Sequence, residues 1–112
     1  MGGHTPGMTA SDLLDPTSVT AALADLSPDW AGSPKALIRS IRFADAPTAV
    51  RFISDLYALC EERDHHADLA LSYDTVEATL TTHSAGGVTR SDVELAYEVD
   101  RIAASLPLHD DA

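Results

Sequence analysis

Apolar residues follow a helical period in three segments of the chain and an alternating period in the segments between them. The first two helical segments each open on an aspartate with a proline one or two positions later, and the third opens on a Thr-x-x-Asp capping box. Aspartate before proline and the capping box are both signals of a helix N-terminus. The pattern therefore predicts helices over residues 15–27, 45–63 and 89–106.

Alternating apolar and polar side chains predict strands between these helices. Residues 36–43 alternate, with Ile38 as an apolar exception on the more polar face. Residues 69–73 and 76–80 alternate again, and Asp74-Thr75 between them can form a two-residue hairpin turn. The order of elements predicts an α+β fold: a single domain with an antiparallel sheet, which we expect to have four strands, and three helices packed on one of its faces.

The two ends of the chain differ in composition from its middle. Residues 1–11 are rich in Gly, Thr and Pro, and residues 107–112 include two adjacent aspartates. We expect both segments to be disordered tails. They flank one domain over residues 12–106, and a single domain is also what a chain of 112 residues favours.

The chain is strongly acidic, with 7 basic and 18 acidic residues and a formal net charge of −11. A negative field repels phosphate backbones and anionic lipid, so we expect neither nucleic acid nor a membrane surface as a partner. No apolar run approaches the roughly 20 residues that span a bilayer, and residues 1–10 lack the segments of a signal peptide. The single cysteine, Cys60, cannot form an intramolecular disulfide. These features predict a cytoplasmic protein.

Three of the five histidines fall within one short segment. His65 and His66 are adjacent where the second helix gives way to a strand, and His83 ends the second strand of the hairpin. If the hairpin turns at Asp74-Thr75, residue 66 lies opposite residue 83, and the three imidazoles meet at one end of the sheet. An imidazole, with a pKa of about 6.5, is available in both protonation states near neutral pH, as acid/base catalysis requires.

Carboxylates accompany these histidines. Glu61 lies about one helical turn before His65, and Asp64 immediately precedes the histidine pair, so either can orient an imidazole or favour its protonated form. Asp92 is the last residue of the expected capping box, at the third position of the helix, and we favour a capping role for it over a catalytic one. A zinc site is an alternative, because three histidines suffice for catalytic zinc. Adjacent strand residues point in different directions, so His65 and His66 chelate one ion poorly, and we expect neither a metal nor a cofactor.

The order and spacing of these residues are more specific than a lone pair of histidines, which is usually a solvated surface feature. Glu61 is followed by His65-His66-Ala67, Tyr73, His83 and Asp92. This series resembles the pterin-4a-carbinolamine dehydratase family, whose pattern is an acidic residue, three further residues, His-His-Pro, an aromatic residue, a histidine and an aspartate. Weaker similarity, including a Gly-x-Thr helix start, extends the resemblance over roughly residues 13–105.

Two positions depart from that pattern. Ala67 stands in place of the usual proline, so the backbone after the histidine pair loses a restraint on φ. Ser84 follows the third histidine where many relatives carry aspartate, which removes a charge near His83. Neither change removes a catalytic group, but both leave the identity of the substrate open.

The resemblance implies a dehydratase that converts 4a-hydroxytetrahydropterin to quinonoid dihydropterin and so recycles the cofactor of an aromatic amino acid hydroxylase. It implies His65 and His66 as the acid/base pair, His83 as a ligand binder or second acid, and a homodimer or dimer of dimers. Two alternatives stay open. One is a related dehydration, isomerisation or cyclisation of another substrate, and the other is a non-enzymatic dimerisation or assembly factor, a role that members resembling this family also have.

Overall fold

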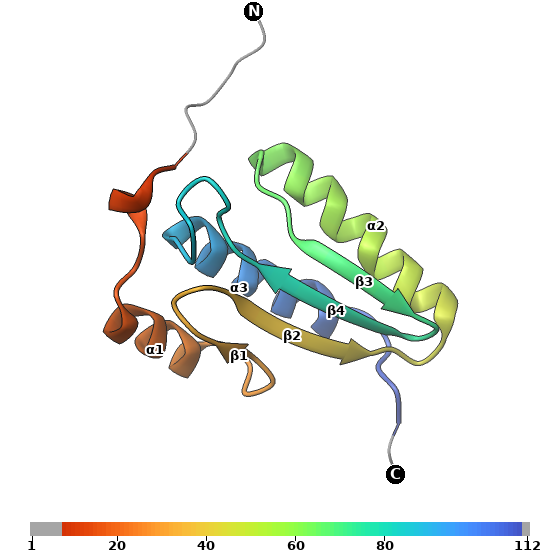
Figure 1. Ribbon diagram of the computed structural model, residues 1–112. Helices are drawn as coiled ribbons and strands as arrows, with labels where there is room; N and C mark the ends of the chain where they lie inside the picture. Colours follow the sequence, from red (N-terminus) through yellow and green to blue (C-terminus); the bar gives the residue numbers. More distant parts are fainter. Residues whose placement is uncertain (1–7, 111–112) are drawn as a thin grey trace, which may run out of the picture.

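The structure, a computed structural model, describes residues 8–110 and has the expected α+β architecture. Four antiparallel strands form one sheet in the order β1-β2-β4-β3, with helices behind it (Figure 1). The strands span Ala31–Gly32 (β1), Leu37–Arg42 (β2), Asp68–Ser72 (β3) and Thr75–Leu80 (β4). The predicted fold class is confirmed.

Three α-helices occupy the predicted segments: α1 (Pro16–Asp25), α2 (Ala46–Arg63) and α3 (Arg90–Ala104). Asp15 and Asp45 cap the first two as predicted, each accepting a hydrogen bond from the backbone N–H three residues ahead, at 2.7 and 2.9 Å. The third opens on the predicted capping box. None of the helices in residues 8–110 is both long and apolar enough to cross a membrane.

The core lies between the sheet and the pair α2 and α3, which pack against each other. Residues of β2 alternate between buried and exposed, and Ile38 is on the exposed face as predicted. Helix α1 lies beside β1, and its Val19 joins the same core. Burial of each large apolar side chain contributes about 1.5–3 kcal/mol. The fully buried members include Leu37, Phe43, Phe52, Leu56, Leu80, Val88 and Val99.

Strand β1 supplies the fourth strand, although the alternation pattern does not predict it. Two residues are too few to show a period, and only the pairing of Ala31 with Ile38 and of Gly32 with Leu37 defines the strand. The pairing requires close approach, because a Cβ at position 32 would lie 2.8 Å from a methyl carbon of Leu37. A larger residue at position 32 would therefore have to displace the end of the Leu37 side chain, and glycine avoids that shift.

The β3–β4 hairpin turns one residue earlier than predicted. Ser72 pairs with Thr75, so the turn is Tyr73-Asp74 and not Asp74-Thr75. Asp74 is held against β2, since its carbonyl accepts the N–H of Phe43 at 2.8 Å and its carboxylate pairs with Arg42 at 3.1 Å. Those tertiary contacts, which the alternation of the strands cannot reveal, fix the position of the turn.

Both ends of the domain extend beyond the predicted limits of residues 12–106. Ala10–Asp12 forms a short 3₁₀ helix with its own capping box. At the other end, the backbone of residues 107–109 joins the end of β2 through two hydrogen bonds of 3.0 Å. These parts of the predicted tails are therefore hydrogen-bonded to the domain. The outermost parts, residues 1–7 and 111–112, lie outside the described residues.

Candidate active site

The C-terminus of α2 positions the histidine pair. Asp64 adopts a left-handed conformation (φ 52°) and directs its N–H to the carbonyls of Cys60 and Glu61. Aspartate is one of the few residues besides glycine that tolerate this conformation. The N–H of His65 then donates to the Cys60 carbonyl at 3.1 Å. Together these bonds turn the chain from the end of α2 back toward β3 (Figure 1).

His65 packs inward against a buried carboxylate. Its side chain is 17% exposed, and its Nε2 lies 2.6 Å from Oδ1 of Asp92, whose side chain is fully buried. An ionised carboxylate can only accept hydrogen bonds, so Nε2 carries the proton and donates it. Nδ1 is then the nitrogen that is available to a ligand. The contact joins the α2–β3 junction to the first turn of α3.

Asp92 is held by donors on both of its oxygens. Its Oδ2 accepts the Thr82 hydroxyl at 2.7 Å and the Thr89 N–H at 2.9 Å. Thr82 donates its one hydroxyl proton to Asp92. In the 2.8 Å hydrogen bond between the two threonine hydroxyls, Thr89 is therefore the donor and Thr82 the acceptor. These bonds offset the cost of burying a carboxylate. Asp92 therefore caps α3 as predicted, and its other carboxylate oxygen contacts the His65 ring.

His66 lies on the outer side and pairs with α2. Its Nε2 is 2.7 Å from Oε2 of Glu61, and both side chains are exposed. The imidazole also meets the ring of Tyr57 edge to face, with ring centroids 6.0 Å apart. Glu61 thus does orient an imidazole, and the imidazole is that of His66.

His83 stands on a tight loop after β4. The carbonyl of Thr82 accepts the backbone N–H groups of residues 85, 86 and 87, which closes the loop. Gly86 has φ +84°, and a Cβ on Gly87 would lie 2.5 Å from the Pro34 carbonyl oxygen, so both positions require glycine. The His83 side chain is 81% exposed, and its Nε2 lies 3.6 Å from Oδ2 of Asp68.

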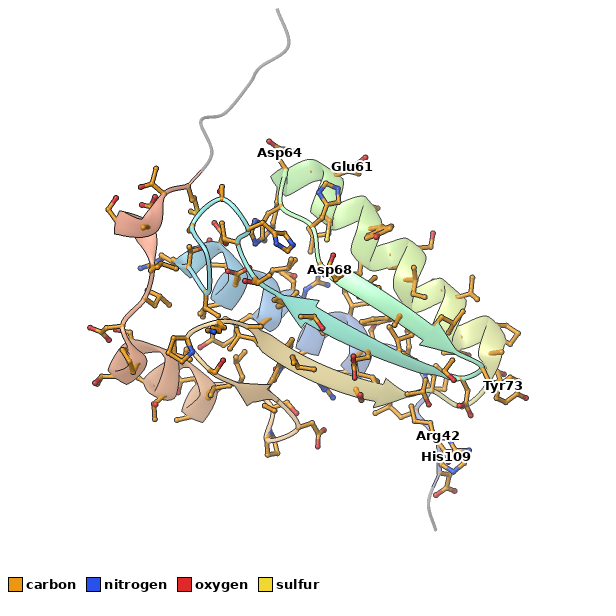
Figure 2. The ribbon with its side chains drawn as sticks, in the orientation of Figure 1. Arg42, Glu61, Asp64, Asp68, Tyr73 and His109 are labelled. Carbon is orange, nitrogen blue, oxygen red and sulfur yellow. The ribbon has the colours of Figure 1, made fainter. Side chains whose placement is uncertain are left out.

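The three histidines thus lie at one end of the sheet, and each faces a different carboxylate. The predicted ladder is not the cause, because strand pairing ends at Asp68 and Thr79 and residue 66 does not lie opposite residue 83. The turn at Asp64 and the loop after β4 bring them together instead. Figure 2 shows Glu61, Asp64 and Asp68 at this end and Arg42, Tyr73 and His109 at the other.

The remaining predicted groups have less direct roles. Asp64 is exposed, and its carboxylate makes no hydrogen bond or ion pair within residues 8–110, so its visible contribution is the left-handed turn. Cys60 is fully buried, and burial raises the pKa of its thiol, an effect to which the Glu61 charge adds. In the described part of the chain, no three His, Cys, Asp or Glu side chains gather closely enough to hold a metal ion.

A pocket of about 290 Å³ opens beside His65, between the end of α2 and the start of α3. Its volume is near the lower limit for ligand pockets, so any molecule that it holds is small. Its lining combines a cation, an imidazole, a hydroxyl, a carboxylate and an apolar side chain. These belong to Arg63, His65, Ser91, Glu94 and Leu95.

Two contributors to the site, Asp68 and Thr82, are not predicted from the sequence. The signal for Asp68 is weak but present: it is an acidic residue two positions after His66, at the start of the strand. Thr82 immediately precedes His83, but threonine is common in strands. Its hydrogen bond to Asp92 bridges β4 and α3, and no local pattern reports such a contact.

Comparisons with known proteins identify the family of this chain. A profile of the family described as pterin 4 alpha carbinolamine dehydratase matches residues 12–102. Proteins named as candidate pterin-4-alpha-carbinolamine dehydratases are similar over most of their length. The protein from Nocardia farcinica is 36% identical over 93 residues, which cover 83% of this chain and 97% of the relative. The protein from Mycolicibacterium smegmatis is 41% identical over 93 residues, which cover 80% and 95%.

Two solved structures share the fold. A crystal structure described as a transcriptional coactivator/pterin dehydratase from Brucella melitensis has a TM-score of 0.76 and 34% identity, covering 80% of this chain and 97% of that one. A pterin dehydratase-like protein, described as a RuBisCO assembly factor in the alpha-carboxysome, has a TM-score of 0.55 and 25% identity, covering 66% and 86%. The profile match spans every histidine and carboxylate of the site. This chain belongs to the pterin 4 alpha carbinolamine dehydratase family.

Proposed function

We propose that this protein dehydrates 4a-hydroxytetrahydropterin to quinonoid dihydropterin by acid/base catalysis with His65, His66 and His83. One observation carries the proposal: each of the three imidazoles at this end of the sheet faces its own carboxylate. A carboxylate beside an imidazole engages one ring nitrogen and leaves the other to give or take a proton from a ligand.

The reaction needs two proton transfers and no change of oxidation state. A general acid protonates the hydroxyl on C4a, the C4a–O bond breaks, and water leaves. The lone pair of the adjacent ring nitrogen, N5, forms the C4a=N5 double bond, and a general base takes the proton from N5. Positioned acid and base groups contribute about 10²- to 10⁴-fold each, and neither step requires a metal or redox cofactor.

The geometry also suggests how the work is divided. His65 is locked through Nε2 to Asp92, so it presents Nδ1 in one orientation beside the pocket. His66 and His83 are more exposed and can approach a ligand from the outer side. Positioning of this kind reduces the entropy lost when substrate and catalytic groups are brought together. The volume of the pocket favours a small ligand, and the net charge of −11 favours an uncharged or cationic one.

We also place self-association at β3, in keeping with the expected homodimer or dimer of dimers. This strand forms one edge of the sheet, and most of its residues, including Leu71, are exposed. An unpaired edge is a natural surface for pairing with a second copy. Light scattering coupled to size-exclusion chromatography measures the mass directly, and a monomer at micromolar concentration would contradict this assignment.

The decisive experiment mixes the purified protein with freshly generated 4a-hydroxytetrahydropterin and follows the quinonoid product in the presence of a chelator. We expect acceleration over the spontaneous reaction, with or without chelator. Alanine in place of His65, His66 or His83 should each lower kcat by about 10²-fold or more. The matched control is His109→Ala, at the opposite end of the sheet, which should leave kcat unchanged. A wild-type rate equal to the spontaneous rate contradicts the proposal.

A second candidate function, a non-enzymatic assembly factor, is favoured by the described roles of the two structural neighbours as a coactivator and an assembly factor. The retained imidazole–carboxylate pairs argue against it, since a scaffold does not need them. Affinity capture with wild-type protein and with the His65→Ala variant distinguishes the two. A partner bound equally by both, together with no dehydratase activity, would favour the assembly role.

A further inference from the structure

The apolar stripe of α2 is wider than the surface that the sheet covers. Phe52 and Leu56 are fully buried, whereas Tyr57 on the neighbouring edge of the stripe is 45% exposed. Its hydroxyl makes no hydrogen bond within residues 8–110. Tyr57 therefore contributes little to the core. Its ring meets the imidazole of His66 edge to face, with an interplanar angle of 77°.

Tyr57 and Glu61 lie one turn apart on the same face of α2, and His66 lies against both. The two contacts restrain different parts of the imidazole. Glu61 fixes the position of Nε2, but a single hydrogen bond leaves the ring free to pivot about its acceptor, and Glu61 is itself exposed. The Tyr57 ring packs against the imidazole and limits that pivot, because aromatic pairs prefer a narrow range of relative orientations.

The backbone on both sides of His66 is held, but it does not fix the plane of the ring. The following residue, Ala67, is 2% exposed and packs in the core, and the N–H of His65 donates to the Cys60 carbonyl. A fixed backbone still leaves the imidazole free to rotate about its side-chain torsions. Without Tyr57, the His66 side chain would keep its hydrogen bond to Glu61 and lose its fixed plane.

We propose that Tyr57 is a positioning residue for His66: its ring braces the imidazole on Glu61 so that Nδ1 stays directed away from α2 and toward the ligand. This role deepens the proposed function and rests on it for its catalytic consequence. Tyr57 does not touch the reacting atoms. The bracing itself is a property of the folded protein and can be measured without substrate.

The test compares Tyr57→Ala and Tyr57→Phe with the wild-type protein. A matched control is Tyr97→Ala on α3, because Tyr97 is 43% exposed and lies away from His66, in a groove between α1 and α3. Nuclear magnetic resonance of the histidine rings reports the tautomer of His66 and the contacts between the two rings. We expect Tyr57→Ala to average the His66 ring signals, whereas Tyr57→Phe and Tyr97→Ala leave them as in the wild type.

In the dehydratase assay, Tyr57→Ala should lower kcat about 3- to 10-fold with little change in KM, since misplacement of a catalytic group mainly affects the chemical step. Tyr57→Phe should keep kcat at the wild-type value, because phenylalanine keeps the aromatic ring. Unchanged His66 signals in Tyr57→Ala, or an equal change in Tyr97→Ala, would overturn the proposal. A change of mass in Tyr57→Ala that accounts for the altered signals would also overturn it, because Tyr57 would then act through subunit packing. If the wild-type protein has no dehydratase activity, the proposed function fails, and the ring signals still decide whether Tyr57 braces His66.

Discussion

Two aspartates of α3, Asp92 and Asp100, each accept three hydrogen bonds of 2.9 Å or shorter, but the donors differ in chemistry. Asp100 accepts the indole N–H of Trp30 at 2.7 Å, the guanidinium of Arg39 at 2.6 Å and the backbone N–H of Ser27 at 2.9 Å. Asp92 likewise accepts a ring N–H from His65, a neutral hydroxyl and a backbone N–H. The two carboxylates are eight residues apart, which is about two turns of the helix.

What separates them is the chemistry of the charged or ring donor. Arginine stays protonated and has no acceptor nitrogen, so the Arg39–Asp100 pair is a permanent link between α3 and β2. The imidazole of His65 meets Asp92 through Nε2 and has a second ring nitrogen, Nδ1, that can exchange a proton with a ligand. The same geometry, repeated along one helix, thus serves as a structural link at one position and as a candidate catalytic group at the other.

Neutralising each aspartate in turn should give the largest difference in activity between the two positions. In Asp92→Asn the amide oxygen faces Thr82 and Thr89, so the amide N–H₂ faces the Nε2–H of His65 and the ring loses its orientation. We expect kcat/KM for the pterin carbinolamine to fall about 10²- to 10⁴-fold. Steady-state rates of the folded variant, checked by circular dichroism, measure this loss.

The counterpart, Asp100→Asn, keeps the same change of charge on the same helix but acts far from the histidines. We expect its kcat/KM to stay within about 3-fold of the wild type, because no group of the proposed chemistry depends on it. Equal loss of activity in the two variants would show that the His65–Asp92 pair has no special part in the reaction.

Removing the permanent cation should affect stability instead of activity. Arg39 is buried, and in Arg39→Met its carboxylate partner remains without a charge to balance it. We expect the free energy of unfolding to fall by about 3 kcal/mol, at the low end of the range for broken buried pairs because Asp100 keeps some exposure. Urea unfolding measures the loss. A variant that is as stable as the wild type, or that folds normally without activity, would contradict the structural role.

Removing the Thr82 hydroxyl, which donates to Asp92, should have an intermediate effect on stability and activity. Thr82→Val keeps the shape of the side chain and removes the donor to Asp92, which we expect to cost about 1–2 kcal/mol of stability and to reduce kcat less than Asp92→Asn does. Thr82→Ser should restore both. The matched control is Thr81→Val, whose hydroxyl bonds the Lys35 carbonyl near the surface. If Thr81→Val and Thr82→Val behave alike, the hydroxyl does not support His65.

Most of the fold could be predicted from the sequence, because the signals for its helices and longer strands are local. Capping aspartates and apolar periods identify all three helices, and alternation identifies β2 and the hairpin. The exceptions depend on contacts distant in sequence. Strand β1 exists only through pairing with β2, and the turn at Tyr73-Asp74 is fixed by Phe43 and Arg42.

The site divides in the same way. Motif spacing is enough to select the three histidines, Glu61 and Asp92 as candidates. It cannot show which carboxylate meets which imidazole, because the partner of His65 is 27 positions away and that of His83 is 15 positions away. The capping signal at Asp92 describes only one of its two oxygens, since the other faces a residue that no helical pattern includes.

A third aspartate, Asp64, differs from both Asp92 and Asp100. It adjoins the histidines, and yet its carboxylate accepts no hydrogen bond within residues 8–110. Its backbone, at φ 52°, ends α2, and asparagine tolerates the same left-handed conformation. Asp64→Asn therefore removes the charge and keeps the turn, and we expect kcat/KM and stability to change by less than about 2-fold and 0.5 kcal/mol. Asp64→Val, which is β-branched and resists positive φ, should instead destabilise the turn and lower activity through His65 and His66. A large loss of kcat/KM in Asp64→Asn alone would mean that the carboxylate acts on the ligand directly, and proximity to the imidazoles would then matter more than a hydrogen-bonded partner.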